Sequence, residues 1–135
     1  IADYLNSAFR SERVVNMIDS LSAIIEPDMP EETQRWNSDM DKWRNNVEYL
    51  RSFARQRPAV LRQQILNKYA LPATHLLTVA LPANGGRIRV NTLTIAENGW
   101  QGSYFENVPL TVTALPAPGY KFAGWNNGRW PQRAT

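Results

Sequence analysis

The sequence contains no cysteine and only one histidine, His75. Without cysteine there is no disulfide framework, no zinc–thiolate site and no thiol nucleophile. Cysteine content therefore does not indicate whether the protein works in an oxidising or a reducing compartment. A single histidine without a neighbouring cysteine or partnered carboxylate in the sequence is a poor metal ligand and a poor catalytic base. We therefore interpret His75 as an ordinary exposed or half-buried side chain, and we expect no metal site.

Long apolar runs are also missing. No stretch approaches the roughly 20 apolar residues that a membrane-crossing helix needs, and residues 1–3 show no signal-peptide pattern. We therefore expect no membrane insertion. The chain begins at Ile1 and ends at Thr135 without a closing element, which favours a piece of a longer protein. The active-site groups of that longer protein would then lie outside this chain.

The motifs of the common enzyme classes are absent as well. The sequence has no Gly-rich phosphate loop, no lysine on a strand beside such a loop, and no aspartate that follows a strand in a metal-binding context. It also lacks a Gly-x-Ser-x-Gly turn for a nucleophilic serine. We predict that this chain alone is not an enzyme, that it has no catalytic residue and that it binds no cofactor.

Charge is nearly balanced, with a formal net charge of +3. Residues 1–71 carry as many acidic as basic side chains, so the excess lies entirely in residues 72–135. Nucleic-acid binders usually show a dense basic patch, whereas these basic residues are widely spread: Arg87, Arg89, Lys121, Arg129 and Arg133. We therefore expect no nucleic-acid partner.

The hydrophobic period changes near Leu71–Pro72, which predicts an α+β chain of two parts. We expect a helical bundle in residues 1–71 and a small antiparallel β-module in residues 72–135. A part of roughly 65 residues buries only about 60% of its unfolded surface, so its stability is marginal. Mutual packing, or a neighbour from elsewhere in the protein, is therefore expected.

Helical spacing is clearest in the first part. Ser11 is a good N-cap for a helix that Pro27 ends, and Ser38 is a good N-cap for a long amphipathic helix. We expect Arg57–Pro58 to end that long helix, because the residue before proline is pushed out of helical geometry, and a last helix to follow as far as Tyr69. The resulting helical hairpin, resting on the first helix, predicts a bundle of three or four helices.

Two carboxylates, Asp39 and Asp41, open the long helix. A catalytic or metal-binding pair is one interpretation. However, residues two apart diverge on a helix, and carboxylates favour the positive end of the helix dipole. Helix capping is therefore the favoured interpretation.

The outer face of the long helix carries Arg44, Glu48, Arg51 and Arg55. A protein-interaction adaptor is one interpretation, and it predicts that Arg51 and Arg55 stand clear of internal partners. The alternative is a solvated face whose charges compensate one another, since Glu48 sits at pairing distance from its arginine neighbours. We favour the solvated face.

From Thr74 the pattern alternates with period two. Asn84–Gly85 predicts a hairpin turn, and a shift of the inward phase predicts a bulge or bend near Asn91–Thr92. Five short strands in one compact antiparallel sheet are expected, at residues 74–81, 87–95, 103–105, 110–114 and 120–125.

Two runs of residues resemble known families. The first contains Ile18–Leu21, Ile25–Pro27, Trp36, Trp43, Val47, Leu50, Phe53 and Arg57–Pro58, and it continues to Gln64. It resembles the C-terminal helices of CotH-family proteins, which are spore-coat kinase-like proteins with large secreted or surface relatives in bacteria. The second contains Tyr104–Phe105, Leu110–Ala114, Pro116, Gly119–Tyr120, Phe122 and Gly124–Trp125. It is similar to the divergent internalin-B-type B-repeat, an extracellular structural module.

The CotH resemblance implies a parent protein that transfers phosphate from ATP to protein serine, with its catalytic groups upstream of the helices matched here. The two resemblances together imply a non-catalytic C-terminal fragment of a secreted or surface protein. Its helices would support the upstream kinase-like domain, which is the expected partner. Its β-module would act as a structural or adhesion unit that contacts a surface protein or a glycan.

A carbohydrate-binding module is the alternative function. Aromatic faces beside amide side chains suit sugar binding. The candidate ligand-binding residues are Trp100 and Trp130, which lie beside glycines in predicted loops, together with Asn126 and Asn127. A small sheet, on the other hand, needs its aromatic residues for its own core.

Overall fold

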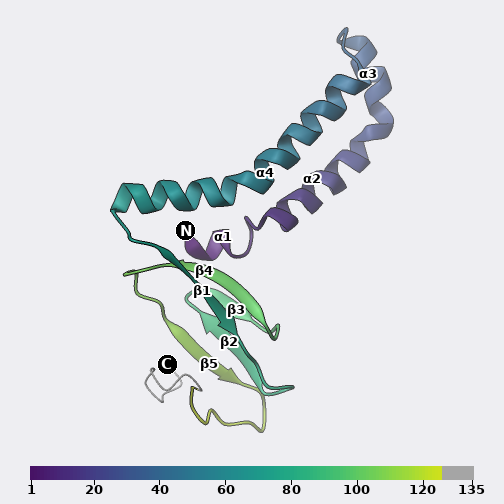
Figure 1. The fold of residues 1–135 in the computed structure, drawn as a ribbon. Helices are drawn as coiled ribbons and strands as arrows, with labels where there is room; N and C mark the ends of the chain where they lie inside the picture. The colour runs from purple at the N-terminus through teal and green to yellow at the C-terminus, as the bar shows by residue number, and fades with distance from the viewer. Residues whose placement is uncertain (126–135) are drawn as a thin grey trace. The chain divides into compact units, whose positions relative to one another are not determined.

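The computed structural model describes residues 1–125 and confirms an α+β fold, with helices followed by small antiparallel sheets (Figure 1). Its contacts divide the chain into two units. Residues 7–70 form the helical unit, and among the described residues 1–6 and 71–125 form the β unit. No helix within residues 1–125 is long and apolar enough to cross a membrane.

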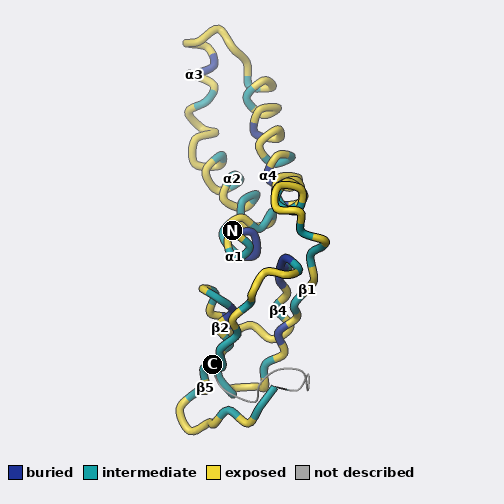
Figure 2. Tube along the Cα trace, turned by 90° about the vertical axis from the view of Figure 1, so that its left-hand side faces the viewer, coloured by how far each residue is buried: buried dark blue, intermediate teal, exposed yellow. Residues whose placement is uncertain are grey.

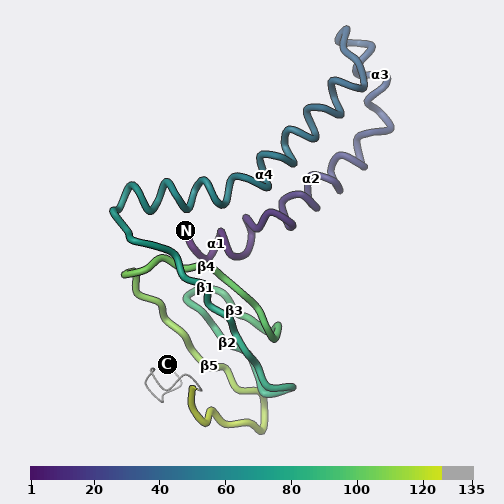
Figure 3. The backbone as a smooth tube through the Cα atoms, in the orientation of Figure 1, coloured from purple at the N-terminus to yellow at the C-terminus, as the bar shows by residue number. Residues whose placement is uncertain are grey.

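The helical unit is a hairpin of two long helices (Figure 3). Helix α2 (Ser11–Ile25) leads through a 3-10 turn, η1 (Glu26–Asp28), into the short helix α3 (Met29–Arg35), and the chain returns as α4 (Met40–Tyr69). The predicted bundle of three or four helices is therefore wrong. The first helix, α1 (Ala2–Leu5), is one turn long and belongs to the β unit, and the helix expected after Pro58 is the second half of α4.

Helix α4 runs through Pro58, so the expected end at Arg57–Pro58 is also wrong. A proline inside a helix removes one backbone hydrogen bond and kinks or breaks the helix, and here α4 continues on both sides of Pro58. Figure 1 shows α4 changing direction along its length. The helix ends at Ala70, which takes a left-handed conformation (φ 50°) and donates its backbone N–H to the carbonyl of Leu66.

The helix caps differ by one residue from those expected. Asp39 rather than Ser38 is the N-cap of α4, and its Oδ1 accepts the backbone N–H of Lys42 at 2.6 Å. The capping interpretation of Asp39 is thus confirmed. Arg10 rather than Ser11 precedes α2, and the Ser11 hydroxyl donates to the carbonyl of Arg55 in α4 at 3.2 Å.

The described part of the β unit contains two antiparallel sheets instead of the single sheet expected. One pairs β1 (Thr74–Val79) with β4 (Trp100–Phe105). The other has the order β3-β2-β5, with β2 (Gly86–Val90) between β3 (Leu93–Ile95) and β5 (Val112–Pro116). Residues 120–125, which were expected to form a fifth strand, are not in a strand.

The positions of the turns explain why there are two sheets instead of one. Asn84–Gly85 does not close a hairpin, because β1 pairs with β4; instead the N–H of Gly85 donates to the carbonyl of Pro82 in a turn that leads to the second sheet. The hairpin lies at Asn91–Thr92, where Val90 faces Leu93 across a two-residue loop and Asn91 has a φ of 47°. The shift of phase in the sequence therefore marks a chain reversal between two strands, not a bulge or bend within one strand.

Both sheets share one core. Val79, Val90, Ile95 and Tyr104 are buried together, one from each of four strands, and Ala2 of α1 packs against them. The side-chain amide of Asn6 pairs with the backbone of Ser103 like a residue of an added strand, donating to its carbonyl at 2.8 Å and accepting its N–H at 2.9 Å. Residues 1–6 thus cover the outer edge of β4, whereas the sequence placed them with the helices.

Candidate functional site

Trp100 is the one candidate ligand-binding residue that lies within the described chain. It is the first residue of β4, not a loop residue, and its half-buried ring packs against the core and over Gly102. A Cβ atom on Gly102 would collide with this ring. The Trp100 ring therefore lies against its own strand and the core. Trp130, Asn126 and Asn127 lie outside the described residues.

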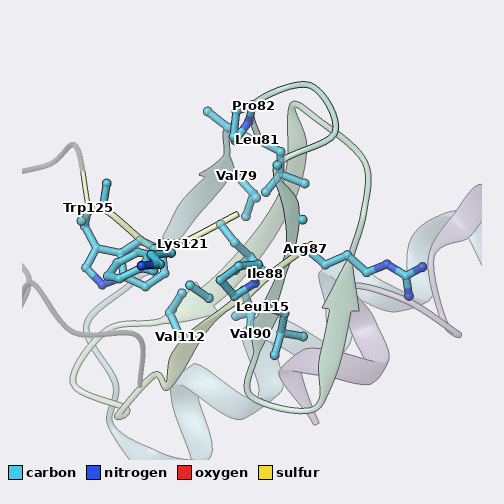
Figure 4. A pocket seen from close by; sticks show the side chains of 18 of the residues that line it. Val79, Leu81, Pro82, Arg87, Ile88, Val90, Val112, Leu115, Lys121 and Trp125 are labelled. Atoms are coloured by element: carbon cyan, nitrogen blue, oxygen red, sulfur yellow. The ribbon is translucent and has the colours of Figure 1, made fainter. Parts of the chain in front are cut away.

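An open groove of about 640 Å³ lies in the β unit. Its walls come from β1, β2, β5 and residues 121–125, and its apolar lining includes the buried residues Val79 and Val90 (Figure 4). Phe122 and Trp125 form an aromatic wall, with ring centroids 4.8 Å apart at 59°. A groove of this volume and lining suits a small apolar ligand.

The groove offers little reactive chemistry. Arg87 and Lys121 are the charged residues among its described lining, and no carboxylate or histidine joins them there. Figure 4 shows Arg87 pointing away from the groove, while Lys121 lies beside Trp125. The apolar lining of the groove therefore fits binding of an apolar group or simple core packing. Sequence reasoning missed the groove because three strands distant in sequence build it.

Asp3 is the most heavily hydrogen-bonded carboxylate of the β unit. It accepts the backbone N–H of Thr92 at 3.1 Å, the Thr92 hydroxyl at 2.5 Å, the Tyr104 hydroxyl at 3.3 Å and the Asn91 side-chain amide at 3.4 Å. Burial alone raises the pKa of Asp3, but these hydrogen bonds outweigh it and hold the pKa below its ordinary value. Asp3 thus fixes the β2–β3 turn.

His75 has a partner that the sequence did not reveal. Its Nε2 lies 2.8 Å from Oε2 of Glu106, across the ends of β1 and β4. The side chain is exposed, as expected, and one carboxylate does not make a metal site. Within residues 1–125 no group of three or more histidine, cysteine, aspartate or glutamate side chains converges.

One side of the helical hairpin is held by ion pairs. Arg51 Nε lies 2.6 Å from Asp19 of α2, and Glu48 lies 3.3 Å from Arg51 and 2.8 Å from Arg55. The hydrogen bond to Asp19 raises the pKa of Arg51, and the hydrogen bond from Arg55 lowers the pKa of Glu48. Both arginines are therefore paired internally and do not stand clear, as the adaptor interpretation predicted they would, whereas the self-compensating charged face is confirmed.

The other side of the hairpin is apolar and exposed, and Figure 2 shows exposure along most of α2 and α4. Helix α2 contains no buried residue. Six large side chains with 47% to 70% of their surface exposed define what we call the apolar face: Met17, Leu21, Ile24 and Ile25 of α2, with Leu50 and Phe53 of α4. An exposed apolar surface of this size marks a site where another protein element can pack.

The comparisons with known proteins bear on the helical unit. No curated protein and no solved structure matched the chain. A family model did match, over residues 1–61, which extend from α1 into the second half of α4. That model describes the CotH kinase protein family, so the match supports the resemblance of this segment to CotH proteins.

Proposed function

We propose that this chain is a non-catalytic part of a CotH-like bacterial protein, in which the helical hairpin supports a kinase-like domain of the same protein. The observation that carries the proposal is the apolar face, which lies within the segment that matches the CotH kinase family. The ion-paired side of the hairpin is well solvated by water. The apolar side is exposed, and covering it with a neighbour would remove apolar surface from water, which is favourable.

The roles of the carboxylates support a non-catalytic chain. Phosphoryl transfer needs carboxylates that hold magnesium and a lysine that contacts the phosphates. Here Asp39 caps a helix, Asp19 and Glu48 pair with arginines, and Asp3 holds a β-turn. These side chains are already engaged in structural contacts. The phosphate chemistry of the parent protein therefore belongs to its kinase-like domain.

For the β unit we propose a structural or adhesion role in a secreted or surface protein, in line with the B-repeat resemblance. The position of Trp100 favours this role over sugar binding, because the ring is half-buried and packs against its own strand and the core. A sugar-binding platform needs an aromatic face open to water. Protease treatment of intact cells tests the location: a surface protein is digested, and an internal one survives.

Phosphoryl transfer by the 135-residue chain is the direct test. The chain is incubated with labelled ATP and either magnesium or manganese, and both phosphate release and self-labelling are measured. We expect neither to exceed the level of a heat-denatured control. Labelling that persists through repeated purification and responds to Asp39→Asn or Asp41→Asn would contradict the proposal. The same chain, mixed with the kinase-like domain of its own protein, is expected to form a complex.

A further inference from the structure

We propose that the apolar face receives an amphipathic α-helix whose apolar stripe is bordered by acidic residues. This inference rests on the proposed support of a kinase-like domain and names the chemistry of the element that the hairpin contacts. The helix that packs on the apolar face would complete the bundle that the sequence predicts but that α2 and α4 alone do not form.

The six residues of the apolar face lie on one side of the hairpin. Helices α2 and α4 are antiparallel, and their register is given by the ion pairs Asp19–Arg51 and Glu26–Arg44. On a helix each residue advances about 100°, so Met17, Leu21 and Ile24 lie roughly a quarter turn from the stripe that contacts α4. Asp19 and Glu26 lie a quarter turn away in the opposite direction.

The same reasoning applies to α4. The residues that face α2 include the buried Val47 and Ala54. Leu50 and Phe53 lie to one side of this stripe, and Glu48 and Arg55 lie to the other. Because the helices are antiparallel, the ion-paired sides coincide and the apolar sides coincide. The hairpin therefore has one charged side and one apolar side.

The border of the apolar face is cationic. Arg13 lies four residues before Met17 on α2, and the Arg57 guanidinium lies 5.9 Å from the ring centroid of Phe53. Lys42, also exposed, lies on the same side of α4. The acidic residues of these two helices lie on the charged side or at the first turn: Glu12, Asp19, Asp41 and Glu48. Charge complementarity therefore favours an acidic occupant.

The size of the face also fits a helix. Six side chains about half exposed present on the order of 600 Å² of apolar surface, close to the roughly 800 Å² that each partner contributes to a standard interface. A helix lying along two antiparallel helices buries its stripe between them. A second copy of this chain fits less well, because it would bring two cationic borders together.

The test uses the folded 135-residue chain, labelled with ¹⁵N, and synthetic helical peptides. One peptide has a leucine stripe bordered by glutamates, and its matched control has lysines in place of the glutamates. We expect the glutamate peptide to shift amide signals of α2 and α4 around the apolar face and to bind about tenfold or more tightly than the lysine peptide. Anionic phosphatidylglycerol vesicles and sedimentation of the chain alone are measured in parallel.

Two variants locate the contact. Leu21→Glu places a charge in the apolar face, and Ala23→Glu places the same charge on an exposed position of α2 that points elsewhere. Only Leu21→Glu is expected to weaken binding of the glutamate peptide, by about tenfold or more. The helix content of both variants should equal that of the natural chain. Arg13→Glu is expected to reduce the preference for the glutamate peptide.

Several outcomes would overturn the inference. These are equal binding of the two peptides, equal loss with Ala23→Glu, self-association through this face, or binding to vesicles but not to peptides. If the chain binds the kinase-like domain of its own protein through the apolar face yet ignores the acidic peptide, the supporting role stands and this inference alone fails.

Discussion

Removal of the Asp3 carboxylate is the sharpest test of how residues 1–6 belong to the β unit. A charge-assisted hydrogen bond typically contributes about 1.5–3 kcal/mol. Asp3 accepts four hydrogen bonds, from Thr92, Tyr104 and Asn91, but it is half-buried and water screens it. We therefore expect Asp3→Ala to lower the opening free energy of β2 and β3 by about 1–2 kcal/mol in total.

Native-state hydrogen exchange measures this change locally, which matters because two units need not unfold in one step. A loss of about 1.4 kcal/mol lowers amide protection about tenfold, and α2 and α4 serve as internal references. Glu97→Ala is the matched control, because Glu97 is an exposed carboxylate of the same unit. Unchanged protection of β2 and β3 in Asp3→Ala would refute the assignment of residues 1–6 to the β unit.

The pH dependence of the same protection follows from the lowered pKa of Asp3. A group whose pKa is lower in the folded state stabilises it above the unfolded pKa, which is about 3.9 for aspartate. That stabilisation is lost as the pH falls through the folded pKa. Protection of β2 and β3 should therefore decline below about pH 4 in the natural chain, and the part due to Asp3 should vanish in Asp3→Ala.

Three further substitutions test other contacts. Asp39→Ala removes the N-cap of α4 and should lower the free energy of unfolding of the helical unit by about 1 kcal/mol, measured by urea denaturation followed by circular dichroism. Gly102→Val would collide with the Trp100 ring and should lower the melting temperature of the β unit, with tryptophan fluorescence reporting the displaced ring; unchanged fluorescence would count against the contact. Arg51→Met breaks the ion pairs of Arg51 with Asp19 and Glu48 and should leave the free energy of unfolding in the same urea assay nearly unchanged, so a large loss would show that the charged side is more than a solvated surface.

The sequence predicted what depends on local periodicity. Spacing of three and four residues located the two long helices, and alternation located most of the strands, because both patterns reflect burial of one face. The capping role of Asp39 followed from a local rule about helix starts. The sequence did not predict that α4 continues through Pro58. A local rule for proline cannot weigh the lost hydrogen bond against the helical preference of the residues before and after Pro58.

What failed was the prediction of long-range pairing. The pairing of β1 with β4 bypasses the Asn84–Gly85 turn, and no local signal distinguishes that turn from a hairpin. The contacts of Asp3 and Asn6 with strands almost 100 residues away are equally invisible to periodicity. The groove and the placement of Trp100 depend on these pairings, so neither could be predicted.

The central claim is that the helical hairpin exists to pack against another part of a CotH-like protein. Calorimetric titration of the 135-residue chain with the kinase-like domain of its own protein tests it most directly. The account predicts a complex with a negative heat-capacity change from apolar burial, weakened by Leu21→Glu and left intact by Ala23→Glu. Absence of binding, or binding that Leu21→Glu leaves unchanged, would contradict it.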